Sequence, residues 1–341
     1  MNKTMNSIGW KYGLMAIMYI ALNYGISILL RLLVPNFVEN HMVLITYLMI
    51  IFTVDLVCFP LIFLLTLKMP KAQIEKKRLG FGKFLLCVLI MYGLVLVGAL
   101  IGLVFHGILT VPFNNTESSK LMELLMNSNP FVRILMVGVV APIFEELIFR
   151  KVLIDHVAPK GELVAILASG IMFGLFHGNF QQCFFACFLG FLFAYIYLKT
   201  GRVIYTILLH MFLNTVTSGI TVGLISWIYK VAESIGIDMT QANPNTSYYN
   251  LPGVEKLALP SLVLVGWVFL LLFIMLAGLI TFIVIACMKK IKINRVEEDD
   301  SFGKQALSLV ASPLMWIFYI ATAVMFILEY LPPIIEFFVS A

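Results

Sequence analysis

Residues 131–151 read FVRILMVGVVAPIFEELIFRK, an apolar run that ends in two adjacent carboxylates and two basic residues. A run of this length predicts a membrane-spanning helix. An acidic side chain at the centre of a span costs about 2.5–3.5 kcal/mol, so we expect Glu145 and Glu146 to face the bundle interior or a wet cavity. Glu146 and Arg150 are four residues apart on one helix face, in the order that favours an ion pair. Glu145 lies about 100° further round the helix, so we expect it to serve chemistry.

The composition excludes a soluble globular chain, because 61% of the 341 residues are hydrophobic and only 12% are charged. Apolar blocks recur along the chain, each long enough to cross the roughly 30 Å hydrocarbon core. The sequence therefore predicts an all-α polytopic membrane protein with about nine transmembrane helices and a catalytic core of four consecutive spans. The predicted spans are 12–33, 42–67, 84–110, 131–152, 162–179, 182–198, 203–229, 260–288 and 307–331.

Intramembrane polar residues gather in one part of the chain, which indicates three regions. Residues 1–130 form an N-terminal three-span region with an outside loop, 131–229 the catalytic core, and 230–341 an outside loop and a C-terminal two-span region. One buried acid lies outside the core region. It is Asp55 in the second span, which we interpret as a packing or helix-contact residue.

The basic residues predict how the chain is oriented in the cell membrane. The connections 68–83 and 289–304 carry the most charge, and placing both in the cytoplasm puts 18 of the 23 Lys and Arg residues inside. This asymmetry is what the positive-inside rule expects. We therefore predict a multi-pass protein with a cytoplasmic N-terminus and an outside C-terminus. The net charge of +5 needs no nucleic-acid partner, because the basic residues lie where topology requires them.

Two further motifs follow the glutamates. The fifth predicted span ends ASGIMFGLFHGNF, with Phe173 and His177 four residues apart, and the seventh contains LLHMFLN, with His210 and Asn214 four apart. Each pair shares one helix face. A carboxylate with an imidazole can activate a water, and imidazole and amide N–H groups can stabilise an oxyanion. The set predicts a hydrolytic site within the membrane. Glu145, His177 and His210 are also possible ligands of a divalent metal such as zinc.

Depth along the predicted spans presents a difficulty. In straight helices Glu145 lies only about 8 Å from the Arg150 end of its span, whereas His177 lies about 24 Å from Gly161. We therefore expect breaks or tilts in these helices, or a segment 151–163 that lies partly along the membrane surface.

The motifs E-E-x-x-x-R at 145–150, F-x-x-x-H at 173–177 and H-x-x-x-N at 210–214 occur in this order, each on its own span. In this they resemble the CAAX-processing and bacteriocin-processing (CPBP, or Abi) family of intramembrane proteases, which includes type II prenyl-protein endopeptidases. The resemblance covers about residues 131–220, including the LKTGR turn at 198–202. It implies the same all-α fold and an endopeptidase activity.

The resemblance also implies a role for each matching residue. Glu145 matches the water-activating glutamate, Glu146 its partner, His177 the histidine that works with the water, and His210 and Asn214 the oxyanion-binding pair.

Supporting positions and partners follow from the same resemblance. Arg150 and Phe173 are expected to hold the site in shape. The substrate would be a peptide or a lipidated protein tail, and the requirement for zinc is left open. Lys151 is a departure, since many members have Gly at this position.

The predicted function is therefore an intramembrane endopeptidase that hydrolyses a peptide bond in a membrane-proximal peptide or protein tail, as in CAAX-type or bacteriocin and leader-peptide processing. The alternative is a non-proteolytic bacteriocin-immunity or membrane scaffold protein that uses the same helices for binding. In that case the Glu146–Arg150 pair would be purely structural and Asn214 a polar helix contact. A proton-coupled transporter is disfavoured, because the two halves of the chain show no repeat.

Overall fold

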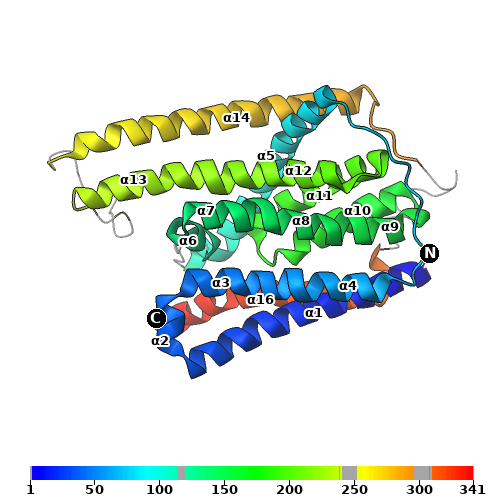
Figure 1. Cartoon of the computed structure of the whole chain (residues 1–341), viewed down its shortest axis with the longest axis horizontal. Helices are drawn as coiled ribbons and strands as arrows, with labels where there is room; N and C mark the ends of the chain where they lie inside the picture. Colours follow the sequence, from blue (N-terminus) through cyan, green and yellow to red (C-terminus); the bar gives the residue numbers. More distant parts are fainter. Residues whose placement is uncertain are drawn as a thin grey trace. The chain divides into compact units, whose positions relative to one another are not determined.

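The computed structural model describes residues 2–113, 120–237, 252–294 and 309–340, together with positions 239 and 307. Within these residues all regular structure is helical, and no strand occurs (Figure 1). The α-helices are α1 (Asn2–Leu33), α2 (Pro35–Asn40), α3 (Met42–Ile50), α4 (Phe59–Thr66), α5 (Phe81–Thr110), α6 (Lys120–Asn127), α7 (Pro130–Arg133), α8 (Ala141–Glu146), α9 (Leu153–Val157), α10 (Glu162–Phe176), α11 (Phe180–Thr200), α12 (Val203–Asn214), α13 (Val222–Ser234), α14 (Ala258–Cys287) and α16 (Met315–Ser340). The all-α class is confirmed.

Several of these α-helices are joined end to end by short segments of π-helix or 3₁₀-helix. The π-helical segments are η1 (Ile51–Cys58), η3 (Ile134–Val140), η4 (Leu147–Val152) and η6 (Thr215–Thr221). Short 3₁₀ turns are η2 (Val111–Phe113), η5 (Ala158–Lys160) and η7 (Val254–Leu257). As a result, residues 130–157 form one continuous helical run that extends beyond the predicted span 131–152.

In the described part of the chain, seven helices are long and apolar enough to cross a membrane. They are Lys3–Leu33, Met42–Thr66, Phe81–Thr110, Phe180–Thr200, Val203–Ser234, Val254–Cys287 and Met315–Pro332. The two remaining predicted spans differ in character. The run 130–157 carries more charged residues than an apolar membrane span does. Helix α10 has only 15 residues, which is about 22 Å of helix and shorter than the hydrocarbon core of roughly 30 Å. A polytopic membrane protein is therefore supported, while the count of nine stays a prediction.

The chain divides into two compact units. Unit 1 comprises Met1–Glu117, Ile143–Leu209 and Met275–Ala341, and unit 2 comprises Ser118–Pro142 and His210–Ile274. These units follow packing, whereas the three sequence regions 1–130, 131–229 and 230–341 follow motif content, so that division stays a prediction.

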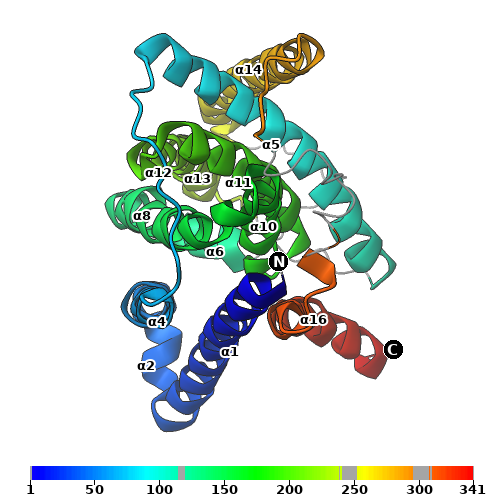
Figure 2. The same ribbon diagram turned by 90° about the vertical axis from the view of Figure 1, so that its right-hand side faces the viewer.

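Small residues allow the helices of unit 1 to approach closely. A Cβ atom on Gly190 of α11 would collide with the backbone of Gly170 in α10, and one on Gly98 of α5 would collide with the backbone of Phe185 in α11. Such contacts replace the hydrophobic driving force that is missing between helices in lipid. Figure 2 shows α10 beside α11, and Figure 1 shows α1 running beside α16.

The connection between α4 and α5 is fixed across one end of unit 1. Its backbone N–H groups at Ala72 and Lys77 donate to the carbonyls of Asp155 and Thr200, at 2.6 and 2.8 Å. The backbone N–H of Asn294 donates to Oε2 of Glu162 at 2.7 Å. Both strongly charged connections therefore reach the same end of unit 1, as the predicted topology requires. Residues 295–304 of the second one lie outside the described residues.

Candidate active site

The segment that carries the glutamate motif is held in place by hydrogen bonds to its backbone carbonyl groups. The two glutamates close α8, and the chain continues through η4 into α9. The hydroxyl of Tyr12 donates to the carbonyl of Ile148 at 2.7 Å, and Oγ of Ser169 donates to the carbonyl of Phe149 at 2.9 Å. Side chains from α1 and α10 thus satisfy carbonyls of the π-helical segment. Such segments are rare and often lie at functional sites.

The ion pair expected from the spacing is present. Nε of Arg150 lies 3.1 Å from Oε2 of Glu146, and both side chains are 0% exposed. The Arg150 guanidinium carbon lies 4.2 Å from the ring centre of Phe173 and 5.4 Å from that of Phe193. An aromatic face attracts a desolvated cation, so the two rings and the carboxylate together offset the burial of the charge. Phe173 thus lies beside the ion pair, and its role in supporting the site stays a prediction.

His177 is oriented by the end of its own helix. Its Nδ1 lies 2.8 Å from the carbonyl oxygen of Phe173. Because a carbonyl can only accept, Nδ1 carries the hydrogen, and Nε2 is the acceptor nitrogen of the neutral ring. The turn after His177 is fixed as well: Gly178 has φ +68°, and Asn179 caps α11 while its Nδ2 donates to the carbonyl of His177 at 3.0 Å.

The two adjacent glutamates lie in different surroundings. Glu146 is fully buried, whereas Glu145 and His177 are partly exposed. Glu145 and His177 also lie at more similar depths than they would if the helix of Glu145 ended at Arg150. Since the helical run continues to Val157, Glu145 lies about 18 Å from its end, and His177 lies about 22 Å from the start of α10. The short turn 158–161 joins these two ends, so both residues stand at a similar level within unit 1.

Two residues outside the motifs interact electrostatically with Glu145. They are Asp55 in η1, through its carboxyl, and Tyr19 in α1, through its phenol. The Tyr19 ring also packs against Phe176, with ring centres 5.2 Å apart. Asp55 shows in the sequence as an acid in an apolar span, but nothing in the spacing of either residue places it near the glutamates.

The third motif belongs to unit 2. His210 is buried near the end of α12. Asn214 closes α12, and its Nδ2 donates to the carbonyl of Val137 in η3 at 3.0 Å. This bond is the helix contact that we weighed as an alternative for Asn214. Unit 1 therefore contains Glu145, Glu146 and His177 with their supporting residues, and unit 2 contains His210 and Asn214.

Of the three possible metal ligands, Glu145 and His177 belong to unit 1 and His210 belongs to unit 2. A catalytic zinc site uses three protein ligands. No group of three or more His, Cys, Asp or Glu side chains that could hold a metal ion occurs among the described residues. The predicted zinc requirement stays open to test.

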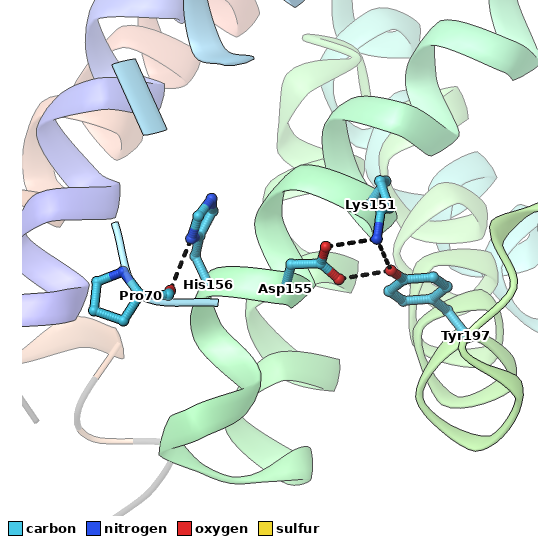
Figure 3. Close-up of polar contacts among 5 residues, drawn as sticks. All are labelled: Pro70, Lys151, Asp155, His156 and Tyr197. Carbon is cyan, nitrogen blue, oxygen red and sulfur yellow. Dashed lines mark hydrogen bonds and ion pairs between the residues drawn. The ribbon is translucent and has the colours of Figure 1, made fainter. Parts of the chain in front are cut away.

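A second polar cluster anchors the end of the glutamate helix (Figure 3). Nζ of Lys151 lies 2.7 Å from Oδ2 of Asp155 and 3.1 Å from the hydroxyl of Tyr197, which donates to Oδ1 of Asp155 at 2.6 Å. Beside it, Nδ1 of His156 donates to the carbonyl of Pro70 at 2.9 Å. Burial lowers the pKa of His156 below its ordinary value. Lys151, the departure from the family pattern, thus joins the helix to α11.

The fold and this site define a multi-pass α-helical membrane protein with carboxylate, guanidinium and imidazole groups in its interior. Residues 127–216 match the family described as type II CAAX prenyl endopeptidase Rce1-like. All three motifs lie in this segment, so the resemblance to CAAX-processing membrane proteases is confirmed there.

Two relatives each match about a quarter of the chain. A predicted membrane peptidase, YdiL of Bacillus subtilis (strain 168), is 34% identical over 83 residues, which are 24% of this chain and 34% of that protein. The membrane-embedded CAAX protease MroQ of Staphylococcus aureus (strain USA300) is 31% identical over 88 residues, 24% of this chain and 36% of that protein. The matches thus span about a third of each relative. No solved structure gives a significant match.

Proposed function

We propose that the protein is an intramembrane endopeptidase that hydrolyses a peptide bond in a membrane-proximal peptide or in a lipidated protein tail. The observation that supports this most is the contrast between the adjacent glutamates. Arg150 pairs with Glu146 in a fully buried ion pair, while Glu145 is partly exposed, as is His177. Adjacent carboxyl groups in different surroundings can take different roles in acid–base chemistry.

In the proposed reaction Glu145 accepts a proton from water as the water oxygen bonds to the carbonyl carbon of the scissile peptide. The electron pair of the C=O bond moves onto the carbonyl oxygen, and we assign the binding of this oxyanion to His210 and Asn214. When the C–N bond breaks, the proton held by Glu145 passes to the leaving nitrogen. The acceptor nitrogen Nε2 of His177 orients the water by accepting its second hydrogen bond.

Glu146 and Arg150 hold the site in shape rather than exchange protons with the water. Since both charges are buried and paired, the ion pair fixes the rotational setting of the helix that carries Glu145. We further propose a cytoplasmic N-terminus and an outside C-terminus in the cell membrane, in keeping with the distribution of Lys and Arg.

The experiment is cleavage by the purified protein in liposomes, with a farnesylated CAAX-type peptide and a hydrophobic leader peptide as probes and mass spectrometry of the products. The control is Glu162→Gln, which changes a glutamate at the far end of α10 that pairs with Lys199. We expect cleavage of one probe by wild type and by the control, and none by Glu145→Gln combined with His177→Ala. Cleavage of neither probe would instead favour the binding or scaffold function. Cleavage by the double variant would show that Glu145 and His177 are not the groups that activate the water.

The same assay tests for a metal. Cleavage that survives 1,10-phenanthroline and EDTA shows that the residues act without a metal ion. Cleavage that is lost and then restored by added zinc shows that a metal is required.

A further inference from the structure

The helix that follows His177 is capped in part by a side chain from the C-terminal helix α16. The N–H groups in the first turn of a helix have no partner within that helix. In α11 the N–H of Gln182 donates to Oδ1 of Asn179 at 2.9 Å. The N–H of Phe180 donates instead to the hydroxyl of Tyr330 in α16, at 3.0 Å. Tyr330 thus completes the cap that Asn179 begins.

His106 in α5 holds the Tyr330 hydroxyl in turn. Nδ1 of His106 lies 3.1 Å from the hydroxyl oxygen, and Nε2 of His106 lies 3.1 Å from Nε2 of Gln181. Because an amide nitrogen only donates, Nε2 of His106 is the acceptor and Nδ1 carries the hydrogen. The Tyr330 oxygen therefore accepts from both His106 and the N–H of Phe180. This network joins α5, α11 and α16, which all belong to unit 1.

The same two helices, α5 and α16, pack around the turn that precedes α11. Gly178 in this turn has φ +68°, and a Cβ atom on it would lie 2.9 Å from Cβ of Met325 in α16. The ring centre of Phe180 lies 4.7 Å from that of Phe326 in α16 and 5.6 Å from that of Phe105 in α5. Glycine gives a backbone many accessible conformations, so these contacts select one of them.

The turn is bonded directly to His177. Nδ2 of Asn179 donates to the carbonyl of His177 at 3.0 Å, and Nδ1 of His177 donates to the carbonyl of Phe173 at 2.8 Å. A shift of the turn therefore moves the backbone of His177 and carries its ring away from Phe173. Helices α5 and α16 lie outside the segment 127–216 that matches the family, so the resemblance implies no role for His106 or Tyr330.

We propose that Tyr330 and His106 are positioning residues, which act on the reaction by fixing the orientation of His177. This inference rests on the proposed function, in which Nε2 of His177 accepts a hydrogen bond from the water. Without the Tyr330 hydroxyl, the N–H of Phe180 loses its partner and the turn is free to shift. A misplacement of about 1 Å in a catalytic group can cost about 10²-fold in rate. The loss falls on kcat, because neither residue is proposed to contact the substrate.

The kinetic test removes one hydroxyl in the liposome assay. For Tyr330→Phe we expect kcat to fall by about 10- to 10²-fold while KM stays the same. Tyr319→Phe is the matched control, because it removes a hydroxyl from the same helix that bonds the carbonyl of Leu309 at 3.4 Å. It should cleave like wild type. His106→Leu should also lower kcat. His106→Asn places a polar atom where Nδ1 meets Tyr330, so it should restore most of kcat.

Nitrogen NMR of isotope-labelled histidine rings tests the same inference without a substrate, with the His177 signal assigned through His177→Ala. Wild type and Tyr319→Phe should show one tautomer, with the hydrogen on Nδ1. Tyr330→Phe should show both tautomers, because the ring is no longer held at the carbonyl of Phe173. The pair His106→Leu and His106→Asn gives the same comparison if Tyr330→Phe does not fold.

The outcomes separate this inference from the proposed function. An unchanged His177 spectrum in Tyr330→Phe, or wild-type kcat in that variant, would overturn the inference and leave the proposed function intact. If wild type cleaves neither probe, the proposed function fails. An altered spectrum would then still support the control of the His177 ring by Tyr330, and an unaltered one would overturn both.

Discussion

The buried ion pair makes a quantitative prediction for stability. Arg150→Met keeps an apolar side chain of similar length but leaves the Glu146 carboxylate in the interior without its countercharge. Removing one partner of a buried pair costs about 3–5 kcal/mol. The Phe173 and Phe193 rings, at 4.2 and 5.4 Å, also lose the cation between them. We therefore expect Arg150→Met to lower the free energy of unfolding by about 3–5 kcal/mol.

Glu146→Gln should cost less, because the amide oxygen still accepts and the aromatic rings still hold the guanidinium. The double variant has neither buried charge, so it should recover at least about 2 kcal/mol relative to the sum of the single effects. The assay is reversible unfolding of the purified protein in mixed micelles, followed as a double-mutant cycle.

A second ion pair provides the matched control. Lys199 and Glu162 lie 2.6 Å apart, but their side chains are 28% and 17% exposed. This pair is only partly exposed, and its coupling should be smaller than that of a fully buried pair; exposed pairs are typically worth below about 1 kcal/mol. If the coupling energy from the Glu146–Arg150 cycle is below about 0.5 kcal/mol, or no larger than the coupling energy of the control pair, our account of the buried pair is wrong.

Three further predictions concern topology, pH and the third motif. In a Cys-free background, Lys76→Cys should resist an impermeant thiol reagent in intact cells and Lys230→Cys should be labelled; labelling of Lys76→Cys would refute the cytoplasmic N-terminus. Because burial lowers the pKa of His156, the unfolded state binds its proton more readily, so thermal stability should fall as the pH drops below about 6.5. His156→Gln should reduce that dependence, and an unchanged pH profile would exclude this cause. His210→Ala or Asn214→Ala should each lower kcat about 10²–10³-fold by removing an oxyanion donor, and unaltered rates would return both residues to a structural role.

Much of the fold follows from the sequence because membrane helices must satisfy their backbone groups internally. Apolar blocks therefore locate the long helices well. The ends of polar helices are less visible: the run 130–157 continues past Arg150 because Leu153, Ile154 and Val157 pack in the unit 1 core. If the helix is taken to end at its charged residues, Glu145 lies close to the helix end. This assumption created the apparent difference in depth between Glu145 and His177.

In the site, too, contacts within one helix can be predicted from the sequence, whereas contacts between distant helices cannot. The Glu146–Arg150 pair follows from four-residue spacing, because only one helix is involved. Contacts between helices distant in sequence leave no such signal. The hydrogen bond from Tyr12 to the carbonyl of Ile148 depends on the packing of α1 against the glutamate segment.

The most direct test of the central claim is the cleavage rate of Glu145→Gln beside His177→Ala and the double variant, measured on whichever probe the wild type cuts. The amide keeps the shape of the glutamate but cannot accept a proton from water, so each single change should abolish cleavage. Residues that act as one unit lose activity non-additively, so the double variant should be no slower. All three proteins should insert and fold with wild-type yield. Wild-type cleavage by Glu145→Gln would contradict the account, because the group that is to activate the water would then not be needed.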